Sequence, residues 1–319
     1  MIISSSATFD TSLDAGCTGG VIVQTGGPDI CILRHETISI EAGVSLVVTG
    51  PRAIALVADR TVSIAGFLDV SAEGEKNGPG GGTLRSGGSG VSPNGFGGAG
   101  FKTQGGSGGT STLDGGAGNA GQPIDPASLA VLVGGPQIVP EIDPNGSLGP
   151  GGGAAVLVSC LGTVDVNGEI HAGGGRGAGG GFIVFANLGG SGGGAGGNVV
   201  FQGADVVITG HLFANGGSGG AGKPSGSGTG APGYEGERSL VAITGGIGTA
   251  GGGSGGAGGS GTSLPGHGKL TTMAPMSTAG GGGGSVGFFQ SYTPAGVTPT
   301  LTPSAASPAP QPNGTIPTR

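Results

Sequence analysis

Glycine constrains this chain more than any other residue type. It accounts for 84 of the 319 residues, roughly a quarter, where about 7% is usual. The glycines form GG, GGG and GGx clusters without the strict third-position frame of a collagen triple helix. Ordering a glycine costs roughly 0.5–1 kcal/mol more than ordering an alanine. Collagen is therefore excluded, and an ordered chain of this composition needs dense backbone hydrogen bonding to offset that cost.

The overall composition argues against an intrinsically disordered chain. Hydrophobic residues make up 34% of the sequence and charged residues only 9%, whereas disordered chains combine low hydrophobicity with high net charge. Aromatic residues are 4% and tryptophan is absent. We therefore expect a folded protein in which a conventional core of large side chains covers only part of the length.

A β-strand pattern recurs between the glycine stretches, at residues 36–50, 53–72, 155–174 and 197–216. The copies share the pattern V-x-V-x-G-x-L-x-A followed by glycine, and 53–72 aligns with 155–174 without a gap. Alternation gives each copy one buried face, and the central glycine gives a corner. The corner glycines are Gly66, Gly168 and Gly210. The predicted core residues of the repeat are Ile54, Leu56, Val62, Ile64, Leu68, Val70, Val156, Val158, Val164, Val166, Ile170, Val200, Val206, Ile208 and Leu212.

These copies predict an all-β fold with essentially no α-helix. One copy cannot bury its own apolar face, but stacked copies can, so we expect a β-solenoid or a stacked β-sheet of short repeats. Glycine-rich arms leave the repeats at 73–152, 173–196 and 216–285. Their GGx strings suit three-residue turns, which predicts a layer of polyglycine-II helices beside the strands. Mobile loops on a small β-solenoid are the alternative.

Residues 1–292 are expected to form a single domain that contains all repeats and arms. Residues 293–319 are rich in proline, threonine and serine, which predicts an extended tail that either wraps on the surface or acts as a tether. Phenylalanines are expected to fill the space between the strands and the glycine layer: Phe96, Phe101, Phe182, Phe185, Phe201, Phe213, Phe288 and Phe289.

Two of the three cysteines could form a disulfide. Cys17 and Cys31 flank a segment that could fold back as a hairpin and bring the sulfur atoms together. Two small buried thiols are the alternative, and Cys160 is expected to be such a buried thiol. A disulfide would agree with export to an oxidising compartment.

Charge and hydropathy exclude several classes of partner. A formal net charge of -7 argues against nucleic acid, which requires a basic surface. The sequence contains no run of 18 apolar residues, so it predicts no transmembrane segment. The N-terminal MIISSSATFD does not resemble a signal peptide. Either Met1 precedes a mature exported sequence, or export is unconventional, or the protein is cytoplasmic.

Short motifs of known chemistry do not meet their structural context. GSGGAGKP at 217–224 approaches a phosphate-binding loop, but Pro224 stands where Ser or Thr should bind magnesium. Strings of the form G-x-S-x-G surround Ser107, Ser191 and Ser218, but none lies between a strand and a helix. We therefore predict no catalytic nucleophile and no cofactor.

The histidines and carboxylates do not form a convincing site in the sequence. His171 and His211 each follow a corner glycine and could lie on adjacent strands, but a metal site needs three or four ligands. Outward carboxylates show no pair placed for acid–base catalysis: Glu169, Asp165 and Asp205. We predict no metal and no catalytic residue.

Three stretches resemble a known group of proteins. They are VSLVVTGPRAIALVADRTVSIAGFLDVSA followed by GPGGG, GGNVVFQGADVVITGHLFANGG, and the ending GGGGGSVGFFQSYTPAGVTPTLTPSAASPAPQPNGTIPTR. Over nearly the whole chain the sequence resembles the glycine-rich, mostly uncharacterised cell-surface and extracellular proteins of myxobacteria. This resemblance implies an exported or cell-surface protein without a known activity.

Together these observations predict a non-enzymatic, extracellular structural or adhesive surface protein. Open ends and strand edges of a strand stack would allow head-to-tail self-association into filaments. The alternative is a monomeric binding module that uses a flat polyglycine face to bind ice, a glycan or a cell surface. Regular rows of threonine would favour ice, and the repeat contains none.

Overall fold

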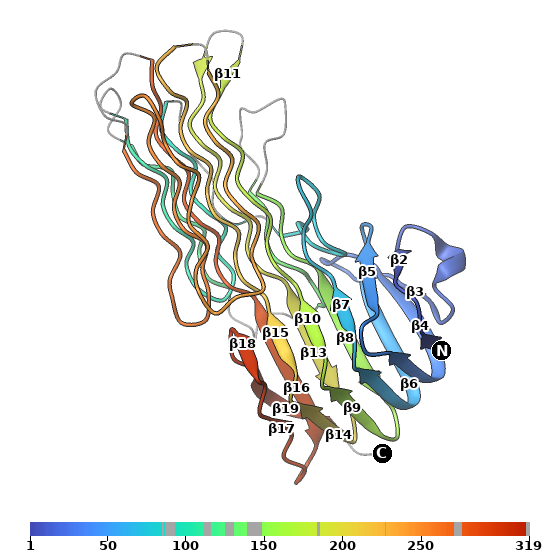
Figure 1. Cartoon of the computed structure of the whole chain (residues 1–319). Helices are drawn as coiled ribbons and strands as arrows, with labels where there is room; N and C mark the ends of the chain where they lie inside the picture. Colours follow the sequence, from blue (N-terminus) through green and yellow to red (C-terminus); the bar gives the residue numbers. More distant parts are fainter. Residues whose placement is uncertain are drawn as a thin grey trace.

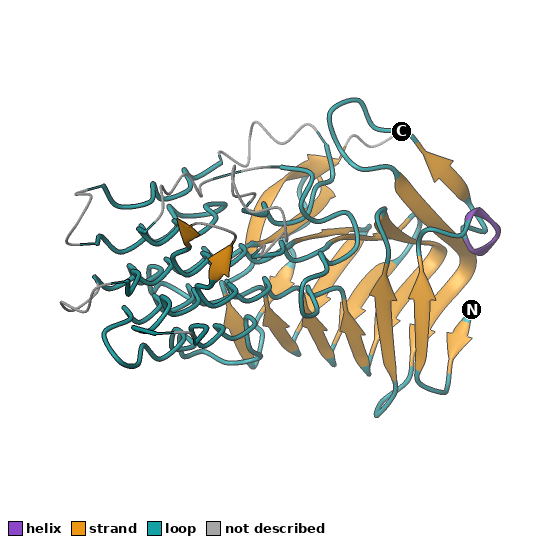
Figure 2. Cartoon of the chain, turned by 90° about the horizontal axis from the view of Figure 1, so that it is seen from above, coloured by secondary structure: helices purple, strands orange, loops and turns teal. Residues whose placement is uncertain are grey.

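The computed structural model describes residues 1–84, 86, 93–111, 116–124, 131–138, 149–183, 186–226, 228–270 and 276–316. In these ranges the chain forms strands, glycine-rich segments without regular secondary structure, and one short 3-10 helix, η1 (Asp14–Gly16). The strands gather at one end of the molecule, and the glycine-rich segments run side by side at the other (Figure 1). Figure 2 shows the same division from above.

Most strands lie in two large sheets, together called the β body below. The larger sheet contains β1 (Ile2–Ile3), β3 (Gly20–Ile22), β4 (Ile30–Ile40), β6 (Ala53–Ile64), β8 (Ala154–Ser159), β9 (Thr163–Val166), β13 (Asn198–Gln202), β14 (Asp205–Ile208), β16 (Phe288–Pro294), β17 (Thr300–Leu301) and β19 (Gln311–Ile316). The smaller sheet contains β2 (Ala7–Asp10), β5 (Ser45–Thr49), β7 (Phe67–Asp69), β10 (Glu169–His171), β15 (His211–Phe213) and β18 (Ala305–Ser307). A separate antiparallel pair consists of β11 (Phe182–Ile183) and β12 (Ala186–Asn187).

The prediction of a β-solenoid or a stacked sheet of short repeats is wrong. The strands form two large, mostly parallel sheets, and the larger follows a barrel-like path of eight strands, β17-β14-β9-β6-β8-β13-β16-β19. β6 has 12 residues; its first half pairs with β8 and its second half with β9. Because one continuous strand serves two partners, the structural unit is a shared sheet and not a coil of short, equal repeats.

The alignment of the repeats holds in their second halves and fails in their first halves. Val62 pairs with Val164, as the ungapped alignment requires, but Ile54 pairs with Ala155 and not with Val156. The stretch from Ala155 to Val164 is one residue longer than the stretch from Ile54 to Val62, with which it pairs. A shift of one residue turns every side chain of a strand to the other face. Three predicted core residues are therefore only half-buried: Val156, Val158 and Val200. The buried residues of β8 and β13 include Ala155, Leu157, Val199 and Phe201.

The other predicted core residues lie in one hydrophobic cluster of the β body. This cluster holds Ile54, Leu56, Val62, Ile64, Leu68, Val70, Val164, Val166, Ile170, Val206, Ile208 and Leu212, each fully buried. The chain passes from the larger to the smaller sheet at Gly66, Gly168 and Gly210. A Cβ on Gly168 would lie 2.1 Å from the carbonyl oxygen of Gly66, and one on Gly210 would lie 1.9 Å from that of Gly168. Glycine is required there because neighbouring corners touch through their backbones.

The described glycine-rich segments, here called the glycine bundle, are joined by backbone hydrogen bonds whose direction repeats every three residues. In segment 216–222, successive N–H groups donate to three different neighbouring segments. The first segment accepts every third bond, from Gly216 to Gly259, from Gly219 to Gly256 and from Gly222 to Gly253. The second accepts from Gly217 at Gly194 and from Gly220 at Ser191, and the third accepts from Ser218 at Tyr234 and from Ala221 at Ala231. Three residues per turn is the repeat of a polyproline-II helix. Hydrogen bonding between neighbours thus offsets the conformational cost of ordering glycine.

The phenylalanines and the C-terminal segment connect the glycine bundle with the β body. Phe101 and Phe288 pack edge to face, with ring centroids 4.7 Å apart, in a second buried cluster. Phe96, Phe201, Phe213 and Phe289 are also buried. Phe182 is exposed, and Phe185 lies outside the described residues.

Residues 293–316 do not stand apart from the β body, because they continue β16 and add β17, β18 and β19 to both sheets.

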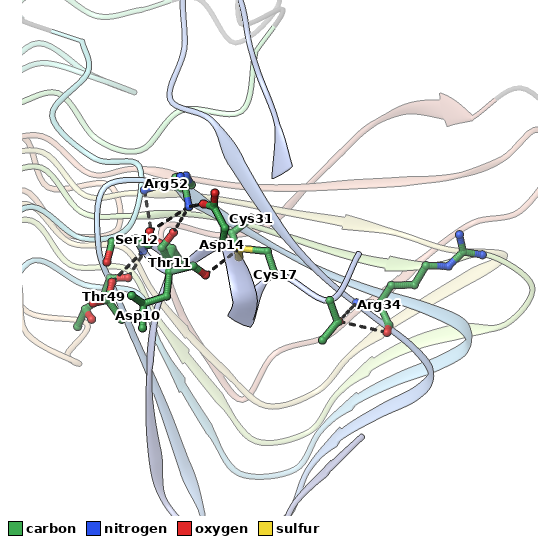
Figure 3. The surroundings of a disulfide bond; sticks show 11 residues. Asp10, Thr11, Ser12, Asp14, Cys17, Cys31, Arg34, Thr49 and Arg52 are labelled. Atoms are coloured by element: carbon green, nitrogen blue, oxygen red, sulfur yellow. Dashed lines mark hydrogen bonds and ion pairs between the residues drawn. A yellow bond between two sulfur atoms is a disulfide. The ribbon is translucent and has the colours of Figure 1, made fainter. Parts of the chain in front are cut away.

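A disulfide between Cys17 and Cys31 ties the N-terminal loop to β4 (Figure 3). Both cysteines are buried in the main cluster. Nearby, Arg52 forms an ion pair of 2.6 Å with Asp14 in η1. Cys160 is exposed, contrary to the expectation of a buried thiol, because it lies in the turn that follows β8.

Candidate functional site

The outer face of the smaller sheet borders a hollow of about 930 Å³. It is lined by the ends of β5, β7 and β10, by residues 71–73, 75–78 and 81–83, and by Glu235 and Arg238. Parallel strands end at the same edge of a sheet, so their last outward side chains meet there. Asp69 from β7 and His171 from β10 are paired residues of adjacent strands and face this hollow together.

Asp69 is a hydrogen-bond acceptor that organises this edge. Its Oδ1 accepts from the Ser71 amide at 2.9 Å and from the Ser71 hydroxyl at 2.6 Å, and lies 3.5 Å from Nδ1 of His171. The other ring nitrogen of His171 lies 2.8 Å from the Gly236 carbonyl oxygen. Burial raises the pKa of Asp69, but the hydrogen bond and charge of His171 and the hydrogen bonds from Ser71 outweigh it, so the pKa is lowered. Asp69 therefore joins β7 to β10 through His171, and His171 in turn contacts Gly236 of the 235–238 segment.

At this edge the Ser71 hydroxyl donates to the Asp69 carboxylate. The two ring nitrogens of His171 face Asp69 and the Gly236 carbonyl oxygen. His211 does not join His171, because β15 places it opposite Glu169. Nowhere in the described ranges do three His, Cys, Asp or Glu side chains converge as a metal site would require.

Arg238 divides the hollow from a smaller one of about 410 Å³. Its guanidinium lies 4.8 Å from the ring centroid of Phe67 and 3.4 Å from the Glu169 carboxylate. The protein's own arginine therefore covers the ring of Phe67, the aromatic residue that lines both hollows.

A serine–histidine contact occurs in the glycine bundle. Nδ1 of His267 lies 2.8 Å from the Ser107 hydroxyl and accepts the Ser107 amide at 3.0 Å. A catalytic histidine is in turn oriented by a third group, and among the described residues no carboxylate forms an ion pair with His267. This contact therefore fixes the imidazole on the surface. Of the other serines in G-x-S-x-G strings, Ser191 and Ser218 are buried.

The second candidate site is a surface of the glycine bundle. Segment 253–259 donates to Gly246 and Ile243 on one side and accepts from Gly266 and Lys269 on the other. Beneath, the same segment contacts 278–284 and 216–222. Segments 241–248, 253–259 and 264–270 thus form one layer, called the outer layer below, that rests on two inner segments.

Side chains project from the outer layer at a three-residue spacing. In the middle segment, Ser254 and Ala257 are half-buried, while 253, 255, 256, 258 and 259 are buried. The flanking segments expose large apolar side chains: Val241 (74%), Ile247 (67%), Leu264 (70%) and Leu270 (55%). At 3.1 Å per residue, such positions recur about every 9 Å.

We define the apolar face by the outward residues of the three segments: Val241, Thr244, Ile247, Ser254, Ala257, Leu264, His267 and Leu270. This face was not among the sites predicted from the sequence. Its signal is the three-residue spacing of 241, 244 and 247 and of 264, 267 and 270 within glycine-rich sequence. This spacing is visible in the sequence, but the sequence does not show which segments lie side by side.

No protein-family model, curated protein or solved structure matches this chain. The resemblance to myxobacterial surface proteins therefore stays a prediction. Within the described ranges, no helix is long and apolar enough to cross a membrane.

Proposed function

We propose that this protein is a non-enzymatic adhesive protein that acts outside the cell and binds a surface through the apolar face. The observation that carries this proposal is the outer layer, in which large apolar side chains stand exposed on a hydrogen-bonded backbone layer. Exposed apolar surface bordered by polar residues marks interaction sites in soluble proteins, and four large apolar side chains stand on this one layer.

The support beneath the apolar face suits adhesion. The outer layer rests on segments 216–222 and 278–284, which are themselves hydrogen-bonded to further segments. Side chains held on such a platform lose little conformational freedom on binding, which favours affinity. The β body then acts as the base of the platform.

The disulfide supports an extracellular location. Disulfides form and persist in oxidising environments and are rare in the cytosol. The Cys17–Cys31 bond, together with the sequence resemblance described above, favours a secreted or cell-surface protein.

The strand edges favour a single chain over a filament subunit. β19 at one end of the larger sheet contains Pro312, and its pairing with β16 is irregular between Ser291 and Tyr292. Proline and bulges on an edge strand hinder pairing with another chain. We therefore place the adhesive surface on the glycine bundle and not at the sheet ends.

Adsorption to a sensor coated with alkyl chains tests this proposal. The face variant replaces four exposed residues by serine: Val241, Ile247, Leu264 and Leu270. The control variant replaces four exposed residues of the β body by serine: Ile22, Val23, Leu161 and Val297. We expect wild type and the control variant to adsorb equally, and the face variant to lose about tenfold or more. Equal losses in both variants would overturn the proposal.

A further inference from the structure

We infer that the surface bound by the apolar face is a lipid layer with anionic headgroups. This inference rests on the proposed function, because it names the chemistry of the surface that the face contacts. Three observations support it: the distribution of charge, the polar residues within the face and the bulk of the outward side chains.

Charge is distributed unevenly along the chain. The formal net charge is -7, yet no Asp or Glu follows Glu237. The outer layer therefore carries no carboxylate, and its titratable groups are His267 and Lys269. Glu235 lies beside the smaller sheet, where its carboxylate accepts the Gly74 amide. An anionic surface would repel the carboxylates of the β body, but the outer layer has no carboxylate to be repelled. The protein would therefore bind with its outer layer toward the surface.

The composition of the apolar face matches the boundary between headgroups and acyl chains. Val241, Ile247, Leu264 and Leu270 can enter the acyl boundary, as the apolar side of an interfacial helix does. Thr244 and His267 stand between them at the same spacing and favour a shallow position. Lys269 can reach the headgroups while its methylene stem stays beside the leucines.

Another glycine bundle fits this face less well. Inside the bundle, segments touch through their backbones: a Cβ on Gly256 would lie 2.1 Å from the Gly266 carbonyl oxygen. A second copy could extend this packing only across a surface without bulky side chains, and Ile247 and Leu264 prevent that approach. A fluid lipid layer adapts its shape to such side chains.

Vesicle flotation of the full chain tests the inference. The probes are vesicles of phosphatidylcholine alone and of phosphatidylcholine mixed with phosphatidylglycerol, at low salt. We expect wild type and the control variant to float with the anionic vesicles about fivefold more than with the neutral ones. The face variant should lose this binding. Lys269→Glu, which replaces the one lysine of the outer layer by a carboxylate, should reduce flotation with anionic vesicles by more than about tenfold and flotation with neutral vesicles much less.

The outcomes separate this inference from the proposed function. If wild type adsorbs to alkyl chains through the apolar face but floats with neither vesicle, the lipid inference is wrong and the adhesive function stands. Equal flotation with neutral and anionic vesicles also overturns the inference. If the face variant keeps both adsorption and flotation, both proposals are wrong.

Discussion

Replacing Gly284 by alanine tests whether the glycine bundle is a close-packed, ordered body. Gly284 lies within segment 278–287, and its amide donates to the Gly217 carbonyl at 2.8 Å. A Cβ on Gly284 would lie 2.0 Å from the carbonyl oxygen of Gly194, whereas ordinary contact begins at 3.4 Å. The two segments would have to separate by the difference between 3.4 and 2.0 Å, about 1.4 Å.

That separation would break hydrogen bonds on either side of the substitution. The amide of Gly193 donates to Gly282 at 2.8 Å, and the amide of Gly196 donates to Ser285 at 2.9 Å. Lengthening either bond by more than about 1 Å takes it outside the range of a hydrogen bond. Each lost bond costs about 1 kcal/mol, and the buried groups left without a partner cost more. We expect Gly284→Ala to lower the free energy of unfolding by about 2–4 kcal/mol and the Tm by roughly 5–15 °C.

The assay is thermal unfolding combined with amide hydrogen exchange of segments 189–197 and 278–287. Gly181→Ala is the matched control, because the nearest atom to its Cβ, in the Thr229 side chain, lies 4.0 Å away. That substitution should be neutral or slightly stabilising, since alanine reduces the entropy of the unfolded chain. If Gly284→Ala and Gly181→Ala unfold at the same temperature with the same exchange rates, the close-packed bundle is refuted.

Two further predictions concern the β body. Leu157→Ala should lower the free energy of unfolding by about 2–5 kcal/mol, whereas Val158→Ala, at a half-buried position, should lower it by about 1 kcal/mol or less. Urea unfolding measures both values, and equal losses would contradict the register of β8. The lowered pKa of Asp69 contributes stability that is present above its ordinary value of 3.8 and lost as the pH falls through the lower folded value. Asp69→Asn should remove this part of the acid transition, and an unchanged dependence of Tm on pH below 3.8 would contradict the contacts of Asp69.

The sequence by itself determined the local character of each stretch. Alternating residues such as Val62 and Ile64 predicted strands with one buried face, because side chains alternate along a strand. The corner position of Gly168 was also readable, since a repeated glycine between two alternating runs marks a close backbone approach. The apolar face was not predicted, because the three-residue spacing of its residues does not show which segments lie side by side.

Only the tertiary structure decided which segments are neighbours. The register of β8 depends on how Ala155 pairs with Ile54, about a hundred residues earlier in the chain, and one extra residue in a turn changes the buried face. The sharing of β6 between β8 and β9 replaced the predicted solenoid with two large sheets. Glycine segments carry almost no side chains to specify a partner, so their order follows from backbone hydrogen bonds such as Gly193 to Gly282. The apolar face exists because those bonds place three separate segments in one layer, and a local sequence pattern does not contain that information.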